Sequence, residues 1–481
     1  MPKREEEEEP LSPMARVFQS PGMDNCIVIT IGFKEKINVD FILNDLKHNV
    51  SKHPRFSSKL SDNGAKWIKT DVDVEDHVFT PNIDSEEMGE DGESFVDDYI
   101  SRLTVIPLDR SRPLWDIHIL NVKTSDAEAV TVIRSHHALG DGVSLMSLLL
   151  ASTRKTSNLD EFPTIITSSK RRKTVFQGLT NKGWFFRSIL AICYAAKLIW
   201  NTIADFFLLL ATILFLKDTE TPLKGGVSVQ KNFCHRIVSL DDLKLIKTAT
   251  NMTINDVLLG VTQAALSGYL NRLYDKKNAE DGTSKSNRNN LPSKLRFRAG
   301  VAVNLRHNIG FKALADMMAK DSKCRWGNYM SFIIFPMSIS LETDPLVYLS
   351  KAKSTMDRKK HSFHSALVYL TTGFVFKTLG AKVGAALFNR PVLHTTTSIS
   401  NIVGPMEKIS FHGNPIAYIA PSSYGHSQPL VIHFLSYAKK MVISIGVDPT
   451  VIPDPHKLLD EIEESLKAMK ASLCEKAYSR T

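Results

Sequence analysis

The sequence predicts an α/β protein built from two domains, and three observations lead to that prediction. The chain has 481 residues, which exceeds the length at which a single hydrophobic core usually stops growing. Strand-like and helix-like patterns alternate in both halves of the chain. A basic, polar linker at 154–182 and an apolar run, Trp184–Leu216, separate the halves. We therefore expect domains at 1–180 and 218–475, joined by an apolar segment at 181–217.

Apolar and β-branched runs predict four strands in the first half, at 26–33, 67–74, 114–122 and 129–135. The last two are separated by a short polar stretch, so they are expected to pair as a hairpin. Helical spacing predicts helices at 39–50 and 143–151. The acidic stretch 84–98 is expected to be a loop followed by the start of a helix.

The apolar run Trp184–Leu216 admits three interpretations: a single membrane span, an in-plane or hairpin membrane helix, and a buried helix. Arg187, Lys197 and Asp205 interrupt it, and its longest charge-free piece, Phe206–Leu216, is too short to cross a bilayer. A Lys or Asp at the bilayer centre costs about 2.5–3.5 kcal/mol on insertion scales. Flanking aromatic residues favour contact with a membrane over burial; they are Trp184, Phe185, Phe186 and Trp200.

The second half repeats the alternation of strands and helices. Its predicted strands lie at 235–239, 295–305, 331–335, 396–402 and 430–447. Its predicted helices lie at 254–273, 346–360 and 455–471. A polar insertion at 276–294 is expected to be a loop.

The charge distribution narrows the function classes. The net charge is +9, but residues 1–100 carry −11 and the remainder carries +20. With 43% hydrophobic and 23% charged residues, the composition excludes a wholly disordered, a collagen-like and a polytopic membrane protein. The basic surplus indicates a surface that attracts phosphate groups. It is not interleaved with aromatic residues as in RNA-binding motifs, so nucleic acid is not an expected partner.

No feature of the chain predicts secretion or a metal site. The N-terminus lacks the apolar stretch of a cleaved signal, and Glu5–Glu9 is expected to be a solvated, disordered tail. The cysteines are scattered and form no Cys-x-x-Cys pair, which argues against a disulfide framework or zinc and for a reducing compartment. They are Cys26, Cys193, Cys234, Cys324 and Cys474.

One short segment stands out as a site of chemistry, His136-His137-Ala138-Leu139-Gly140-Asp141-Gly142. A histidine between a strand and a helix is held rigidly, and its neutral imidazole can accept a proton from a hydroxyl near pH 7. Asp141 can fix the loop or cap the helix, and the glycines allow close backbone approach. The alternative is an ordinary turn with solvated histidines. His-x-x-x-Asp-Gly is expected by chance only about 0.04 times in such a chain, so we favour the functional interpretation.

The segment resembles the HHxxxDG signature of acyl-CoA-dependent acyltransferases related to chloramphenicol acetyltransferase. That signature is shared with non-ribosomal condensation domains, but further motifs resemble the plant branch of the wax ester synthase/diacylglycerol acyltransferase family. The resemblance extends from about residue 10 to 470. The motifs are Leu11-Ser12-Pro13-Met14, Pro54-Arg55-Phe56, Pro113-Leu114-Trp115, Asn255-Asp256-Val257, Arg325-Trp326-Gly327-Asn328 and Ser400-Asn401-Ile402-Val403-Gly404-Pro405.

The resemblance implies two chloramphenicol-acetyltransferase-like domains with the active site in a tunnel between them. It implies that His137 is the general base, that His136 supports the site and that Gly142 keeps it open. Asp141 is expected to orient the loop through an ion pair rather than to touch substrate. The other domain is expected to supply the donors that stabilise the oxyanion, and the candidates are Ser398, Ser400 and Asn401.

Three further residues are candidates for a supporting role. Asn255 and Asp256 could assist catalysis, but Asp256 could equally cap or orient its helix, and we favour structure. Arg306 could hold an aspartate or a phosphate, and structure is again favoured.

The expected reaction is direct transfer of a long-chain acyl group from acyl-CoA to a fatty alcohol, which forms a wax ester, with diacylglycerol as a second acceptor. The alternatives are an enzyme acting mainly on diacylglycerol and a non-catalytic lipid-binding protein. No cofactor is expected, because acyl-CoA is a substrate. The expected location is the endoplasmic reticulum membrane, with both domains facing the cytosol, or else the plasma membrane.

Overall fold

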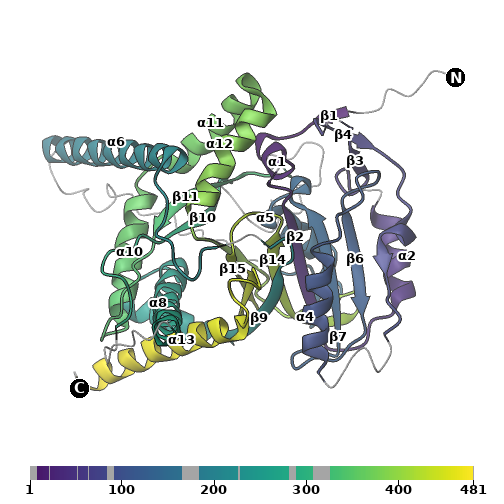
Figure 1. Cartoon of the computed structure of the whole chain (residues 1–481). Helices are drawn as coiled ribbons and strands as arrows, with labels where there is room; N and C mark the ends of the chain where they lie inside the picture. Colours follow the sequence, from purple (N-terminus) through teal and green to yellow (C-terminus); the bar gives the residue numbers. More distant parts are fainter. Residues whose placement is uncertain are drawn as a thin grey trace.

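The computed structural model describes residues 8–20, 22–50, 53–62, 64–83, 91–164, 184–225, 228–280, 289–306 and 326–479. Some predicted features fall outside these ranges, namely most of the linker, residues 5–7 of the tail, parts of the acidic stretch and of the polar insertion, Cys324 and Arg325. The described residues form two large sheets, each covered by helices, and this confirms the α/β class (Figure 1).

The first large sheet contains five strands of the N-terminal half and two of the C-terminal half. Its seven strands lie in the order β5 (Val78–Phe79), β6 (Trp115–Leu120), β7 (Ala129–His136), β2 (Cys26–Phe33), β14 (Asn414–Tyr424), β13 (Ile409–Phe411) and β8 (Thr153–Lys155). β6 and β7 are antiparallel neighbours, so the predicted hairpin is confirmed. A short 3-10 turn, η2 (Val74–Asp76), precedes β5.

Successive side chains of a strand point to opposite faces, and the core of this sheet follows that rule. Ile27 and Ile31 of β2 pack with α2 (Val39–Asn49) and α5 (Gly142–Ala151), whereas Val28 packs with α4 (Gly92–Leu103). The sheet therefore has helices on both faces.

The N-terminal tail departs from the prediction. Glu8–Pro10 forms β1, which pairs with β4 (Lys66–Lys69), and β4 pairs in turn with β3 (Ser58–Leu60). The disordered tail predicted at Glu5–Glu9 is therefore wrong for Glu8 and Glu9. Backbone pairing with β4 and an ion pair between Glu9 and Arg55 hold this end of the chain. The strand predicted at 67–74 is also shorter than expected, since β4 ends at Lys69.

The second large sheet lies in the order β11 (Met330–Pro336), β10 (Arg298–Asn304), β12 (Thr397–Val403), β15 (Leu430–Tyr437), β16 (Lys440–Val447) and β9 (Asn232–Ser239). The strand predicted at 430–447 is two strands. The chain reverses between Tyr437 and Lys440 with Ala438 at φ 51°, a left-handed turn without the Gly or Asn that would have marked it in the sequence.

Helices bury the apolar face of the second sheet. They are α7 (Leu240–Thr250), α8 (Ile254–Glu280), α10 (Leu346–Lys360) and α13 (Pro455–Tyr478). Val257, Leu258 and Val261 of α8 lie in this core, as the helical spacing of the sequence predicts. α8 continues to Glu280, so the start of the polar insertion predicted at 276–294 is helical.

The two sheets do not divide the chain at a single point. β13 and β14 lie within the predicted C-terminal domain at 218–475, yet both strands belong to the first sheet. β14 pairs antiparallel with β2 along nearly its whole length, from Ile416 opposite Phe33 to Tyr424 opposite Cys26. The C-terminal half thus completes the sheet that carries the HHxxxDG segment.

Three helices form an extension on one side of the molecule. α6 (Trp184–Leu214), α11 (His364–Thr378) and α12 (Gly380–His394) pack against one another, and one end of α6 projects beyond the body (Figure 1). A short helix, α1 (Pro13–Phe18), lies against α11 and α12. The sequence did not lead us to predict α11 or α12. α6 is long and apolar enough to cross a membrane by length and composition.

Candidate active site

The HHxxxDG segment joins β7 to α5 through a tight turn. β7 ends at His136, a 3-10 turn η3 covers His137–Leu139, and α5 begins at Gly142. Asp141 is the N-cap of α5, because its Oδ1 accepts a hydrogen bond from the backbone N–H of Ser144 at 3.0 Å. The predicted order of strand, tight loop and helix is therefore present.

His136 stabilises the turn through hydrogen bonds outside the cavity. Its Nδ1 accepts the backbone N–H of Ala138 at 3.1 Å, so its Nε2 carries the proton and donates to Oδ1 of Asp24 at 3.0 Å. Arg110 also binds Asp24, at 2.8 Å. His136 is buried and does not line the cavity described below, which fits the supporting role expected for it.

His137 is held in one tautomer by Asn328. The Asn328 amide nitrogen donates to the backbone carbonyls of His137 at 2.9 Å and of Ala138 at 3.3 Å. Its Oδ1 lies 3.1 Å from Nδ1 of His137 and can only accept, so Nδ1 carries the proton. The lone pair is therefore on Nε2. Phe18 of α1 stacks on the ring at a centroid distance of 3.9 Å and fixes its plane.

Burial lowers the pKa of His137 to about 4, and the Asp141 carboxylate and the Asn328 hydrogen bond oppose this only in part. The imidazole is consequently neutral at physiological pH. A neutral imidazole with a free Nε2 lone pair can accept a proton from a hydroxyl.

Asp141 ties the signature loop to the second half of the chain. Its Oδ2 accepts from Nη1 of Arg306 at 2.7 Å and from the backbone N–H of Tyr329 at 2.9 Å. Arg306 also donates through Nη2 to the carbonyl of Gly327 at 2.8 Å, and Ser144 donates to the same oxygen at 3.0 Å. We call the contacts among Asp141, Ser144, Arg306 and Gly327–Tyr329 the clamp. Of the two interpretations of Arg306, the structure has the one in which it holds an aspartate.

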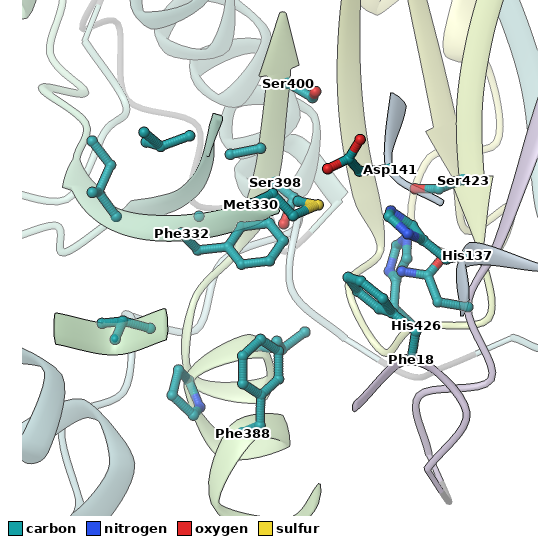
Figure 2. A pocket seen from close by; sticks show the side chains of 18 of the residues that line it. Phe18, His137, Asp141, Met330, Phe332, Phe388, Ser398, Ser400, Ser423 and His426 are labelled. Atoms are coloured by element: carbon teal, nitrogen blue, oxygen red, sulfur yellow. The ribbon is translucent and has the colours of Figure 1, made fainter. Parts of the chain in front are cut away.

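A cavity of about 370 Å³ lies between the two sheets and the helical extension. Figure 2 shows Phe18, His137 and His426 on one side, with Met330, Phe332 and Ser398 facing them. The rest of its wall is mainly apolar and includes residues of α6, α11 and α12, namely Phe206, Leu209, Ile213, Val368, Val375, Leu387 and Phe388. Gly142 also lines it, and a Cβ at that position would lie 2.5 Å from Cδ1 of Ile402. Glycine therefore keeps α5 and β12 close together.

The three oxyanion candidates all line the cavity from β12, but two of them have other partners. The hydroxyl of Ser398 donates to Oε1 of Gln428, and the amide of Asn401 donates to Oδ1 of Asn255. Asn255 is thus brought to the site edge through Asn401. Ser400 is the candidate whose side chain has no hydrogen bond to another described residue.

Asp256 is placed for structure. It is fully buried, its Oδ2 accepts the backbone N–H of Thr253 at 2.9 Å, and the Thr253 hydroxyl accepts the backbone N–H of Asp256 at 3.2 Å. This reciprocal pair caps α8. Lys360 approaches the same carboxylate at 3.1 Å, and Asp256 is not among the residues that line the cavity.

Sequence reasoning missed several residues of the site. Asn328 lies within the motif Arg325–Asn328, but its spacing assigns it no role, and His426, Gln428 and His433 belong to no motif. The three come from the segment that links β14 to β15 and from β15 itself. A histidine two residues before a glutamine carries no signal unless the fold is known to bring that segment beside His137.

Comparison with known proteins matches two family models to this chain. Residues 35–258 match the wax ester synthase/diacylglycerol acyltransferase catalytic domain, and residues 326–470 match the WS/DGAT C-terminal domain. Wax ester synthase/diacylglycerol acyltransferase 7 of Arabidopsis thaliana is 67% identical over 473 residues, 98% of each chain. Wax ester synthase/diacylglycerol acyltransferase 8 of the same plant is 65% identical over 478 residues, again 98% of each chain.

Solved structures share the fold at low sequence identity. The wax ester synthase/diacylglycerol acyltransferase from Marinobacter aquaeolei VT8 superposes with a TM-score of 0.60 at 17% identity, covering 96% of this chain and 99% of that one. The starter condensation domain of rhizomide synthetase gives 0.54 at 13% identity, with coverage of 97% and 94%. The predicted two-domain fold is thereby confirmed. On its two domain models and its full-length plant relatives, this chain belongs to the wax ester synthase/diacylglycerol acyltransferase family of acyltransferases.

Proposed function

We propose that this acyltransferase moves a long-chain fatty acyl group from acyl-CoA to a fatty alcohol and so forms a wax ester, with diacylglycerol as a second acceptor. The observation that carries the proposal is the lone pair of His137 Nε2, which Asn328 fixes on a ring lining a largely apolar cavity. An apolar wall suits aliphatic chains, and one buried neutral base suits a hydroxyl nucleophile. The plant relatives are named for both activities.

In the proposed reaction His137 removes the proton of the acceptor hydroxyl as its oxygen attacks the thioester carbon. The carbonyl electrons move to oxygen, and the intermediate then collapses and expels the thiolate of coenzyme A, which takes the proton back from His137. His136 and Asp141 hold the loop and take no part in the proton transfer. No acyl-enzyme and no cofactor take part.

We further propose that α6 lies in the plane of a membrane rather than crossing it. Two of its polar residues bind the rest of the protein. Asp205 accepts from Lys359 at 2.7 Å and from Arg358 at 3.0 Å. Asn201 donates to the backbone carbonyl of His361 at 3.0 Å. A span would have to draw a carboxylate away from two cations and into hydrocarbon, which is costly.

The outer side of α6 supports the same proposal. Trp184 and Trp200 are 80% and 71% exposed. Large apolar side chains are also exposed on α11, on α12 and at the junction between them, among them Leu370, Phe374, Leu379 and Leu393. Amphipathic helices with exposed aromatic residues lie at the membrane interface. Since Phe206, Leu209 and Ile213 of α6 also line the cavity, a lipid could pass from the bilayer to His137 along one helix.

The activity test uses membranes that contain the protein, labelled palmitoyl-CoA, and either hexadecanol or diacylglycerol as the acceptor, beside a His137→Ala control. Wax ester that disappears with His137→Ala supports the proposal. Triacylglycerol alone indicates an enzyme that acts mainly on diacylglycerol. Absence of both products, with retained binding of palmitoyl-CoA, indicates a lipid-binding protein. Product formation that is unaffected by His137→Ala refutes the mechanism.

The location stays a prediction: the endoplasmic reticulum membrane, with both domains facing the cytosol, or the plasma membrane. Glycosylation acceptor sites introduced before Trp184 and after Leu216 test the topology. An in-plane helix leaves both sites unmodified in the endoplasmic reticulum, whereas a span leads to modification of one of them.

A further inference from the structure

A second histidine lines the cavity beside the general base. His426 lies between β14 and β15 and is only 9% exposed, on the same side of the cavity as His137 and Phe18 (Figure 2). Its neighbour Gly425 has φ 84°, and a Cβ there would collide with the carbonyl oxygen of Asp24. Asp24 is also the residue that binds His136. The backbone beside His426 therefore packs against Asp24, the residue that also holds His136 of the HHxxxDG segment.

Neither ring nitrogen of His426 forms a hydrogen bond of ordinary geometry with a described residue, although the backbone of Ser423 interacts with the ring. Burial lowers its pKa to about 4, with a further lowering by the charge of Lys231, and the backbone of Ser423 offsets only part of this. The ring is therefore neutral at physiological pH and has one N–H to donate. Buried polar groups are nearly always paired, so an unpaired one that lines a ligand cavity indicates that the ligand supplies the partner.

The reaction needs such a donor at one particular atom. Attack on the thioester places a negative charge on the carbonyl oxygen, and a fixed N–H in a water-poor site stabilises it strongly. Ser398 and Asn401, expected to serve there, already donate to Gln428 and Asn255. Ser400 could also donate, but its hydroxyl rotates freely until a substrate orients it. The ring of His426 is already held in place by burial.

We propose that His426 is a catalytic residue that donates its N–H to the oxyanion of the tetrahedral intermediate. This inference rests on the proposed acyl transfer and deepens it. As the acceptor oxygen bonds to the acyl carbon, its proton passes to His137 Nε2 and the carbonyl electron pair moves to oxygen, which His426 binds. When the carbon–sulfur bond breaks, the pair returns to form the ester carbonyl and the thiolate of coenzyme A takes the proton from His137.

The test compares three variants at one position in the palmitoyl-CoA and hexadecanol assay. His426→Phe keeps a ring without a donor, His426→Gln restores an N–H, and His426→Ala removes the side chain. Removal of one oxyanion donor costs on the order of 10²–10³ in kcat, so we expect a loss of that size for Phe and Ala with little change in KM. The Gln variant should recover at least about tenfold of that loss.

His364 offers a matched control. It is 2% exposed, its Nδ1 is unpaired among the described residues and burial lowers its pKa to about 4, yet it does not line the cavity. His364→Gln should retain the wild-type kcat, which separates the chemistry from the loss of a buried imidazole.

Three outcomes overturn the inference: a kcat for His426→Phe within about threefold of wild type, a change confined to the KM for hexadecanol, or a larger loss from Ser400→Ala than from His426→Phe. If the Phe variant does not fold, equal kcat values for Gln and Ala refute the inference and a tenfold advantage of Gln supports it. Ester formation by the wild type in the same assay reports separately on the proposed function.

Discussion

Two regions meet at the cavity, and they differ in whether their buried polar groups are hydrogen-bonded within the protein. In the clamp, Asp141 accepts hydrogen bonds from Ser144, Arg306 and Tyr329. In the cavity wall, both ring nitrogens of His426 and Nδ1 of His433 are buried and form no hydrogen bond of ordinary geometry with the described residues. The first region is satisfied by the protein itself, and the second is left for a ligand to satisfy. The contrast separates residues that hold the site from residues that meet the substrate.

The strongest way to break this contrast is to remove the cation of the clamp. Arg306→Met leaves the buried carboxylate of Asp141 without its counter-charge, and loss of one partner of a buried pair costs about 3–5 kcal/mol. Urea unfolding followed by fluorescence measures the change. The double variant with Asp141→Asn should be less destabilised than Arg306→Met alone, and a loss below about 1 kcal/mol for Arg306→Met would show that the clamp is dispensable.

A smaller loss of stability is expected from substitution of Asn328, the clamp residue that is hydrogen-bonded to His137. Asn328→Ala leaves two backbone carbonyls and Nδ1 of His137 unpaired, at a cost of about 1–3 kcal/mol. Because the proton is then free to move to Nε2, kcat should fall at least tenfold, by the loss of the correct tautomer. Asn328→Asp, which keeps the acceptor for Nδ1, should lose less activity, and equal activity of Ala and wild type contradicts the assignment of the tautomer.

The pH dependence of stability tests the same contrast through the buried histidines of the cavity wall. Burial lowers the pKa of His137 and of His426 to about 4 and that of His433 to about 3, from an ordinary value of 6.5. Between those values the unfolded chain binds more protons than the folded one, so stability is lost as the pH falls below about 6.5. His426→Phe removes one such group and should flatten the slope by at most about 1.4 kcal/mol per pH unit. Thermal unfolding from pH 7 to pH 5 measures it, and parallel curves for variant and wild type would contradict it.

The smallest effect, and one of opposite sign, is expected for the stability of His426→Phe at pH 7. An apolar ring replaces an unpaired polar one, so the free energy of unfolding should stay unchanged or rise by up to about 1 kcal/mol. The same variant is expected to lose turnover. A destabilisation of about 2 kcal/mol or more would mean that His426 holds the site, as the clamp does, and does not await a ligand.

The sequence was sufficient for the fold class and for the local geometry around His137. A strand, a tight polar loop and a helix could be predicted there because the β-rich run 129–135 and the apolar run 143–151 each show their own pattern. An ion pair for Asp141 followed from the resemblance to the family. The partner, Arg306, was a candidate in the sequence, but the pairing required the fold.

The residues that the fold brings beside His137 could not be predicted, for a physical reason. His426 and Asn328 reach the cavity through contacts between residues that lie far apart in the chain, and spacing carries no information about such contacts. Likewise, Asp205 and Asn201 interrupt an apolar run, and their meaning depends on Lys359, Arg358 and His361 more than 150 residues later. Three interpretations of that run stayed open because the free energy of each depends on the partners of Asp205 and Asn201, which the sequence does not reveal.

The crossing of β14 into the first sheet has a consequence for how the protein is made. During synthesis the strand carrying His136 emerges early, but one edge of its neighbour β2 stays unpaired until residues 414–424 leave the ribosome. Pairing that is remote in sequence forms slowly and exposes strand edges in the meantime. A nascent chain stopped after the first half would therefore be an aggregation hazard rather than a free-standing half-enzyme. The active site is assembled late, by the last third of the polypeptide.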